Sequence, residues 1–384
     1  MYLLLITIIY LSFVSLGLGD SLFGSAWPVI QRDMNVPIYY AGIVSMTIAG
    51  GTIFAGLMSD RVTRKFGVKI VVPVCVFMTA IALFGFSSAT AFWMLCLWAI
   101  PYGLGGGTLD AAINNYVATH YTSRHMSWLH CFWGVGAMTG PYIMGFHLTH
   151  GIGWSGAYRT IAIGQIVFAV VLVCSFSLWK KCGEAVEDNA PAKGLREILK
   201  IPKVKFALLA FFAYCAIEAT TGLWASTFLV NYRGIEAETA ALFASLFFMG
   251  ITVGRFMAGF VANQLGSMKM IQIGIAIIFV GIIAILAPMD NNIFSFAGLI
   301  VIGLGCAPIF PALIHLTPFN FGAENSQAII GVQMAGAYTG SALIPPLFGL
   351  ITNVAGLGFY PVFLMAFAGL LLVMFMLLSR RGTG

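Results

Sequence analysis

Long apolar segments alternate with short polar or glycine-rich breaks along the chain. A helix that crosses a bilayer needs about 20 mainly apolar residues. Each apolar segment of this chain is at least that long. They cover residues 3–31, 38–58, 69–88, 91–119, 128–149, 156–179, 206–230, 238–262, 269–289, 292–316, 326–351 and 357–379. The pattern predicts an all-α integral membrane protein with twelve transmembrane helices.

A polar stretch from Lys180 to Lys205 divides these segments into two sets of six. We therefore expect an N-terminal six-helix bundle over residues 1–180, a cytoplasmic linker over 181–205 and a C-terminal six-helix bundle over 206–384. The first segment lacks the basic start of a signal peptide, and its apolar run continues past Asp20 to Ile30. We interpret it as the first transmembrane helix.

Composition agrees with a lipid environment. Hydrophobic residues make up 60% of the 384 positions and charged residues only 8%, against about 25% charged in an ordinary soluble domain. The seven cysteines show no spacing typical of zinc sites or of a disulfide framework. We interpret them as small packing residues, and we expect no metal and no cofactor.

Basic residues indicate an orientation in the membrane. With both termini in the cytoplasm, fifteen Lys and Arg fall on the cytoplasmic side, and only Arg32, Arg159 and Arg233 fall outside. Cytoplasmic loops normally carry this excess. We expect a multi-pass protein of the plasma (inner) membrane. The net charge of +6 then reflects topology and contact with membrane lipid, and no nucleic-acid partner is expected.

The two sets of segments are related by internal repetition. Two short motifs recur at an offset of 200 residues, and an acidic motif recurs at an offset of 198. The pairs are Gly103–Gly105 with Gly303–Gly305, Gly136–Gly140 with Gly336–Gly340, and Asp20–Gly24 with Glu218–Gly222. Internal repeats of this kind are typical of transporters that bind solute between two halves and open alternately to either side.

Three acidic residues fall well inside predicted transmembrane helices: Asp20, Asp110 and Glu218. An ionised carboxylate at such depth is costly, so these groups are expected to be protonated, paired or facing water. No Lys or Arg is predicted at comparable depth to pair with them. We predict that all three serve in proton coupling, and that Asp20 and Asp110 also contact solute. The alternative is a neutral acid that hydrogen-bonds a neighbouring helix.

Other polar and aromatic side chains are candidates for the solute site. Asn114 follows Asp110 by four positions and shares its helix face, an arrangement suited to a ligand with several hydroxyl groups. The further candidates are Asn115, Trp133, Trp224, Gln333, His130 and His315. An aromatic face with nearby amides and carboxylates favours a sugar. The alternative for each is a packed His, a satisfied amide or an interfacial Trp.

Residues Gly56 to Gly67 join the second and third predicted helices. The glycines are expected to let the chain turn tightly at the membrane surface, and Asp60 to cap a helix end or hold a basic group. The second half contains a partial echo that begins at Gly254 and Arg255. We predict that these segments form a gate or conformational lock, through Gly56, Asp60, Arg61, Arg64, Lys65 and Arg255.

The Gly56–Gly67 segment resembles the signature between helices 2 and 3 of the major facilitator superfamily, with Thr63 in place of the usual second glycine. The chain is also similar to the fucose permease and glucose/mannose–proton symporter group of that superfamily. This likeness rests on Asp20, Leu109–Asn114, Ile217–Glu218, Gly303–Gly305 and Phe310–Leu313. It implies roles for Asp20 and Asp110 in proton coupling and sugar binding. The asparagines that precede the helix 1 acid of fucose permease are absent here, and its helix 4 acid is Glu rather than Asp.

These observations predict a monomeric secondary transporter, not an enzyme, that couples proton entry to uptake of a hexose-like or other small polar solute. A proton-driven exporter of drugs or lipids has the same fold and stays open as an alternative, as does a non-transporting receptor. Gly17–Asp20 and Pro311–Leu313 fit elements of intramembrane aspartyl proteases. Those enzymes need a Tyr-Asp element on the preceding helix, and here Gly17–Asp20 already lies in the first predicted helix.

Overall fold

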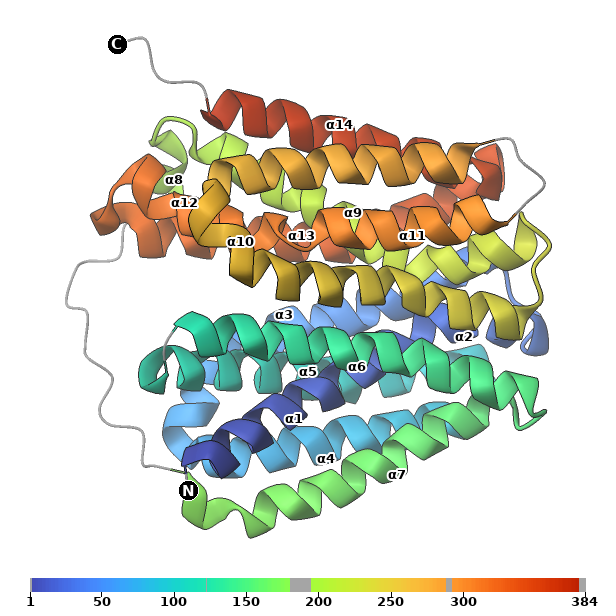
Figure 1. The fold of residues 1–384 in the computed structure, drawn as a ribbon. Helices are drawn as coiled ribbons and strands as arrows, with labels where there is room; N and C mark the ends of the chain where they lie inside the picture. Colours follow the sequence, from blue (N-terminus) through green and yellow to red (C-terminus); the bar gives the residue numbers. More distant parts are fainter. Residues whose placement is uncertain (1, 122, 180–194, 288–291, 380–384) are drawn as a thin grey trace. The chain divides into compact units, whose positions relative to one another are not determined.

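The computed structural model describes residues 2–121, 123–179, 195–287 and 292–379, which are helical apart from short turns (Figure 1). The α-helices are α1 (Tyr2–Asp20), α2 (Leu22–Asp33), α3 (Ala41–Phe66), α4 (Val68–Ser87), α5 (Phe92–His120), α6 (Ser123–Thr149), α7 (Gly153–Cys174), α8 (Leu195–Lys200), α9 (Val204–Asn231), α10 (Ala237–Leu286), α11 (Ile293–Cys306), α12 (Ile309–Phe321), α13 (Ala323–Ala355) and α14 (Tyr360–Ser379). Short 3₁₀ turns lie at Ile38–Tyr40, Phe176–Leu178 and Leu357–Phe359. No strand occurs among the described residues.

The helices correspond to the predicted segments. Within the described residues, eleven stretches are long and apolar enough to cross a membrane, and α6 covers the remaining predicted segment, 128–149. The first segment is divided into α1 and α2 at Ser21, and the tenth into α11 and α12. The prediction of an all-α membrane fold is confirmed.

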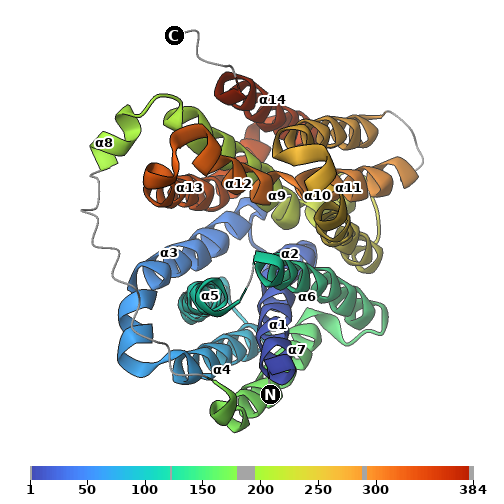
Figure 2. The same cartoon turned by 60° about the vertical axis from the view of Figure 1, so that its left-hand side comes forward.

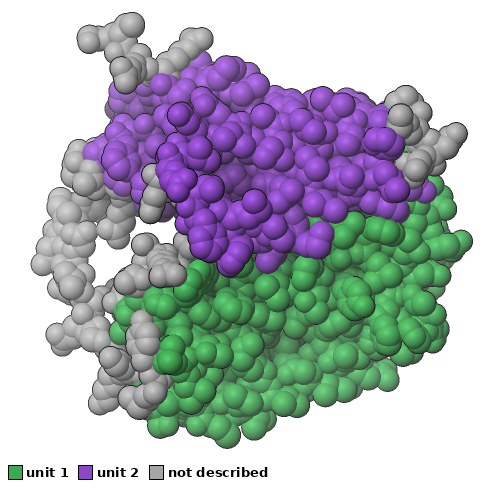
Figure 3. Space-filling model, viewed as in Figure 1, with its two compact units in different colours: residues 1–186, 223–248 green, residues 187–222, 249–384 purple. Residues whose placement is uncertain are grey.

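Contacts group the chain into two compact units, which Figure 3 colours separately. The first unit comprises residues 1–186 and 223–248, and the second comprises 187–222 and 249–384. The predicted division at a linker over residues 181–205 stays a prediction. Of that linker the structure describes residues 195–205, which comprise α8, a turn and the start of α9, and Cys182 lies outside the described residues.

In the first unit, α5 packs against α3 and α4, α1 packs against α6, and α4 packs against α7 (Figure 2). The C-terminal end of α9 and the N-terminal end of α10 belong to this unit. The Ser226 hydroxyl donates to the Ser25 carbonyl at 3.4 Å, and Arg32 Nη2 donates to Asn231 Oδ1 at 3.0 Å. Glycine at position 145 allows Leu242 of α10 to approach α6 closely.

Glycines allow close helix contacts in both units, at interfaces that involve the repeated residues Gly103 and Gly303. A Cβ at Gly103 would overlap the Ile48 carbonyl, so α5 and α3 meet backbone to backbone. A Cβ at Gly250 would overlap the Ile300 carbonyl, beside Gly303, where α10 meets α11. Small residues permit such backbone approach between membrane helices. Gly103 and Gly303, which are 200 residues apart, therefore both lie at close helix contacts.

The predicted turn between the second and third segments is much shorter than expected. Helix α3 continues through Gly56 to Phe66, and Gly67 alone, with φ of 80°, reverses the chain before α4. Gly266, with φ of 73°, marks the corresponding turn inside α10. The expectation that Gly56 contributes to a tight turn is wrong, because helical hydrogen bonding persists to the end of α3. The side chains of Asp60, Arg61 and Arg64 lie outside what the structure describes, and the gate role stays a prediction.

Candidate functional site

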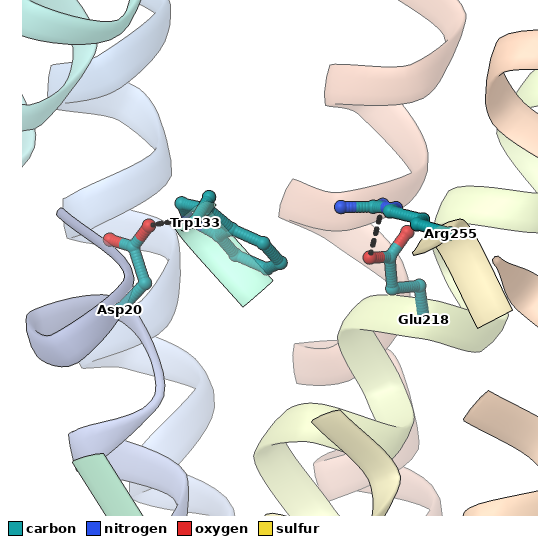
Figure 4. A network of polar contacts seen from close by, with 4 residues as sticks. All are labelled: Asp20, Trp133, Glu218 and Arg255. Atoms are coloured by element: carbon teal, nitrogen blue, oxygen red, sulfur yellow. Dashed lines mark hydrogen bonds and ion pairs between the residues drawn. The ribbon is translucent and has the colours of Figure 1, made fainter. Parts of the chain in front are cut away.

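The carboxylate of Asp20 lies where three helices of the first unit meet. Asp20 is the last residue of α1, and its side chain is exposed although α5 and α6 supply hydrogen bonds to it. The Tyr102 hydroxyl on α5 donates to Asp20 Oδ1 at 2.9 Å. The indole Nε1 of Trp133 on α6 donates to Oδ2, also at 2.9 Å (Figure 4). Each carboxylate oxygen therefore has its own donor.

Two glycines on α1 make this arrangement possible. A Cβ at Gly19 would overlap the Tyr102 hydroxyl, so the absence of a side chain there leaves room for the phenol. A Cβ at Gly17 would overlap the Trp133 carbonyl, so α1 and α6 approach closely one turn before the acid. The contacts of Asp20 with α5 and α6 therefore depend on Gly17 and Gly19 as well as on Tyr102 and Trp133.

A second polar pair lies further along α5. Asn114 Nδ2 donates to Asp110 Oδ1 and to the Asp110 carbonyl, both at 3.0 Å. Both side chains are half-buried, and Asn115 is exposed. Asp20 and Asp110 also interact electrostatically. The structure therefore confirms that Asp110 and Asn114 share a helix face and contact each other.

Glu218 has a partner that the sequence interpretation did not assign to it. Its Oε1 lies 3.5 Å from Nη2 of Arg255, which α10 contributes (Figure 4). The two side chains are only 19% and 13% exposed, respectively. The prediction that no basic residue pairs with the buried acids is wrong for Glu218. The sequence predicted a gate role for Arg255, because the segment around it resembles the Gly56–Gly67 segment. It did not predict the ion pair with Glu218.

The remaining candidates are distributed over both units. In the first, His130 is half-buried with its ring edge-on to Phe13, and Trp224 is fully buried. In the second, His315 is exposed and lies 3.0 Å from the Ser267 hydroxyl. Gln333 is also buried and accepts from the Thr317 hydroxyl at 3.0 Å. Trp133 is the aromatic candidate that hydrogen-bonds Asp20.

Tyr102 was not among the predicted site residues. It lies in an apolar run, where a tyrosine is usually a packing residue. The packing of α5 on α1 brings its hydroxyl to Asp20. The nearest sequence signal is Gly19, directly before the acid. A glycine there indicates close approach by another group, but it does not identify which one.

Comparison with known proteins identifies the family of this chain. The family model for the Major Facilitator Superfamily matches residues 9–332 and 206–383. The chain therefore belongs to the Major Facilitator Superfamily, and it is a multi-pass membrane transporter.

Individual relatives are distant. The chain is 22% identical to bypass of stop codon protein 6 of Saccharomyces cerevisiae, with 91% of this chain and 77% of that protein aligned. It is also 22% identical to the glucose/mannose transporter GlcP of Bacillus subtilis, over 90% of this chain and 87% of that one. The solved structure of the nucleoside transporter NupG superposes with a TM-score of 0.75 at 14% identity, covering 97% and 99% of the two chains. That likeness concerns the fold alone.

Proposed function

We propose that this protein is a proton-coupled symporter of a hexose-like solute that works by alternating access. The observation that carries the proposal is the Asp20 site. It combines an exposed carboxylate, a phenol and an indole within the membrane-spanning part of one unit. An aromatic face packs against the C–H groups of a sugar, and carboxylate and amide groups bind its hydroxyls. Similarity to a glucose/mannose transporter supports the choice of a hexose.

In this proposal Asp20 carries the coupled proton, and Asp110 with Asn114 contributes hydrogen bonds to the solute. Neutral donors hold Asp20, so its charge can change without leaving a fixed cation unpaired. Proton binding removes a negative charge from the membrane interior and so favours closure around solute. Only such differential stabilisation of two states can drive the transport cycle.

The proposal also covers the cellular location of the protein and the two halves that move during transport. The positive-inside bias of the sequence supports cytoplasmic termini in the plasma membrane. The repeated glycine contacts support two six-helix halves, 1–180 and 206–384, joined by a linker. We expect one chain to be sufficient for transport, with protons, solute and surrounding lipid as its partners.

Transport into proteoliposomes tests the proposal. An imposed inward proton gradient should drive accumulation of radiolabelled glucose or mannose above the external concentration, and a protonophore should abolish it. Asp20→Asn should remove the uphill component. Glu197→Gln is the matched control, because it makes the same change from acid to amide on the exposed face of α8. Its accumulation should equal that of the wild type.

Two results would contradict the proposal. Uphill accumulation in Asp20→Asn at the wild-type level would remove Asp20 from coupling. Gradient-driven extrusion of hydrophobic cations, with no accumulation of any hexose, would instead identify a proton-driven exporter. A thermal-shift screen of the purified protein against sugars narrows the solute first, because a bound solute raises stability by mass action.

A further inference from the structure

The two oxygens of the Asp20 carboxylate have chemically different partners. Oδ1 accepts from the Tyr102 hydroxyl, and Oδ2 accepts from the Trp133 indole N–H. An ionised carboxylate only accepts hydrogen bonds, whereas a protonated one has an O–H that must donate. When Asp20 takes up a proton on the lone pair that faces one of these two partners, the hydrogen bond to that partner must therefore reverse or break.

Only one of the two partners can reverse. An indole N–H is a donor and never an acceptor, while a phenol hydroxyl can do either. A proton on Oδ2 would point at the N–H of Trp133, and that hydrogen bond would be lost. A proton on Oδ1 preserves both contacts if the Tyr102 hydroxyl turns from donor to acceptor.

We propose that Asp20 is protonated at Oδ1 and that Tyr102 is the positioning residue that makes this possible. A proton carried by water bonds to Oδ1 of the exposed carboxylate. Tyr102 keeps its own proton and accepts from the new O–H, while Oδ2 continues to accept from Trp133. Release runs in reverse, and no other bond is made or broken. The inference rests on the proposed function, in which Asp20 carries the coupled proton.

The surroundings of Tyr102 fit this reversal. Tyr102 is only 4% exposed, so its hydroxyl needs an internal acceptor once it has turned. Tyr158 on α7 lies near enough to Tyr102 that ionisation of one phenol would be opposed by ionisation of the other. The Tyr158 hydroxyl is buried and has no hydrogen-bond partner in the part of the chain that the structure describes. Asp110 is a further titratable group that interacts electrostatically with Asp20.

Infrared spectroscopy of the purified protein tests the assignment without any solute. The carboxyl C=O stretch that appears on acidification and is missing in Asp20→Asn belongs to Asp20. With the proton on Oδ1, the C=O oxygen is Oδ2, which accepts from Trp133. Trp133→Phe should therefore move this band to higher wavenumber, and by more than Tyr102→Phe does. Tyr214→Phe is the control, because it removes a buried hydroxyl of the second unit that has no hydrogen-bond partner among the described residues, and it should leave the band in place.

A larger upward shift in Tyr102→Phe than in Trp133→Phe would place the proton on Oδ2 and overturn the inference, with the proposed transport function intact. If Tyr102→Phe does not fold, an unmoved band in Trp133→Phe alone overturns it. No Asp20 band at any pH would overturn both the inference and the proposed coupling role.

Discussion

The ion pair between Glu218 and Arg255 gives a quantitative prediction. Both side chains are less than one fifth exposed, so water screens their attraction weakly. At 3.5 Å and an effective dielectric constant of about 20, the Coulomb attraction is on the order of 5 kcal/mol. Desolvation of both charges offsets much of that attraction when the pair forms. Removal of one partner lowers the stability of the protein, because the remaining charge is still desolvated and no longer has the attraction that offset this cost.

Arg255→Gln should destabilise the protein by about 3–5 kcal/mol, the usual cost of a buried charge that has lost its partner, here Glu218. Glu218→Gln should cost less, because Arg255 keeps another interaction. The double variant should recover most of this loss, because neither charge remains. The assay is thermal unfolding of the purified protein in detergent, followed by Trp fluorescence. The shift in melting temperature is about 2–4 °C per kcal/mol for 150–250 residues and smaller for longer chains, so with 384 residues Arg255→Gln should melt on the order of 5 °C lower.

The double variant decides between two explanations. Recovery identifies the charge balance as the origin of the loss in the single variants. A double variant that is as unstable as Arg255→Gln would refute the reasoning, since packing or other contacts would then account for the loss. Two single variants with unchanged melting temperatures would refute it as well, because the pair would then contribute nothing measurable.

Three further predictions concern single contacts. Gly250→Ala should lower the free energy of unfolding by about 1–3 kcal/mol, because the new Cβ overlaps the Ile300 carbonyl. Gly164→Ala is its control, because a Cβ there has open space, and it should leave the melting temperature unchanged or raise it. Gly19→Ala should displace the Tyr102 hydroxyl from Asp20 and so lower uphill accumulation at unchanged expression, and normal accumulation would argue against a role for that contact. Thr317→Val should lower stability by about 1–3 kcal/mol, because it leaves the buried Oε1 of Gln333 without its donor; a melting curve identical to the wild type would indicate another donor.

The helices were predictable from the sequence because lipid imposes a single, strong pattern. Each crossing needs an uninterrupted apolar run, and glycines at a 200-residue offset indicated the repeat. The turn at Gly67 was harder to place, since Gly56 and Gly67 are equally plausible from composition. Of these two glycines, Gly67 has a positive φ and Gly56 does not, and composition does not reveal this property of the backbone.

The site was predictable only in part. Asp20, Asp110 and Asn114 were identified because polar groups are costly in lipid, and a four-residue spacing on one helix indicates contact. Pairs between different helices carry no such signal. Glu218 and Arg255 are 37 positions apart on α9 and α10, and Tyr102 reaches Asp20 from α5. Those pairings depend on the rotation and depth of each helix, which a single sequence does not specify.

Residues 223–248 belong to the first compact unit although they follow the predicted linker. A fragment that ends at residue 186 would therefore lack part of its own unit, with Ser25, Arg32 and Gly145 all missing their α9 and α10 neighbours. A fragment that starts at residue 187 would present the matching surfaces unpaired. Split versions of this transporter should therefore need co-expression of both pieces, and reassembly should depend on this shared stretch of helix rather than on an intact covalent linker.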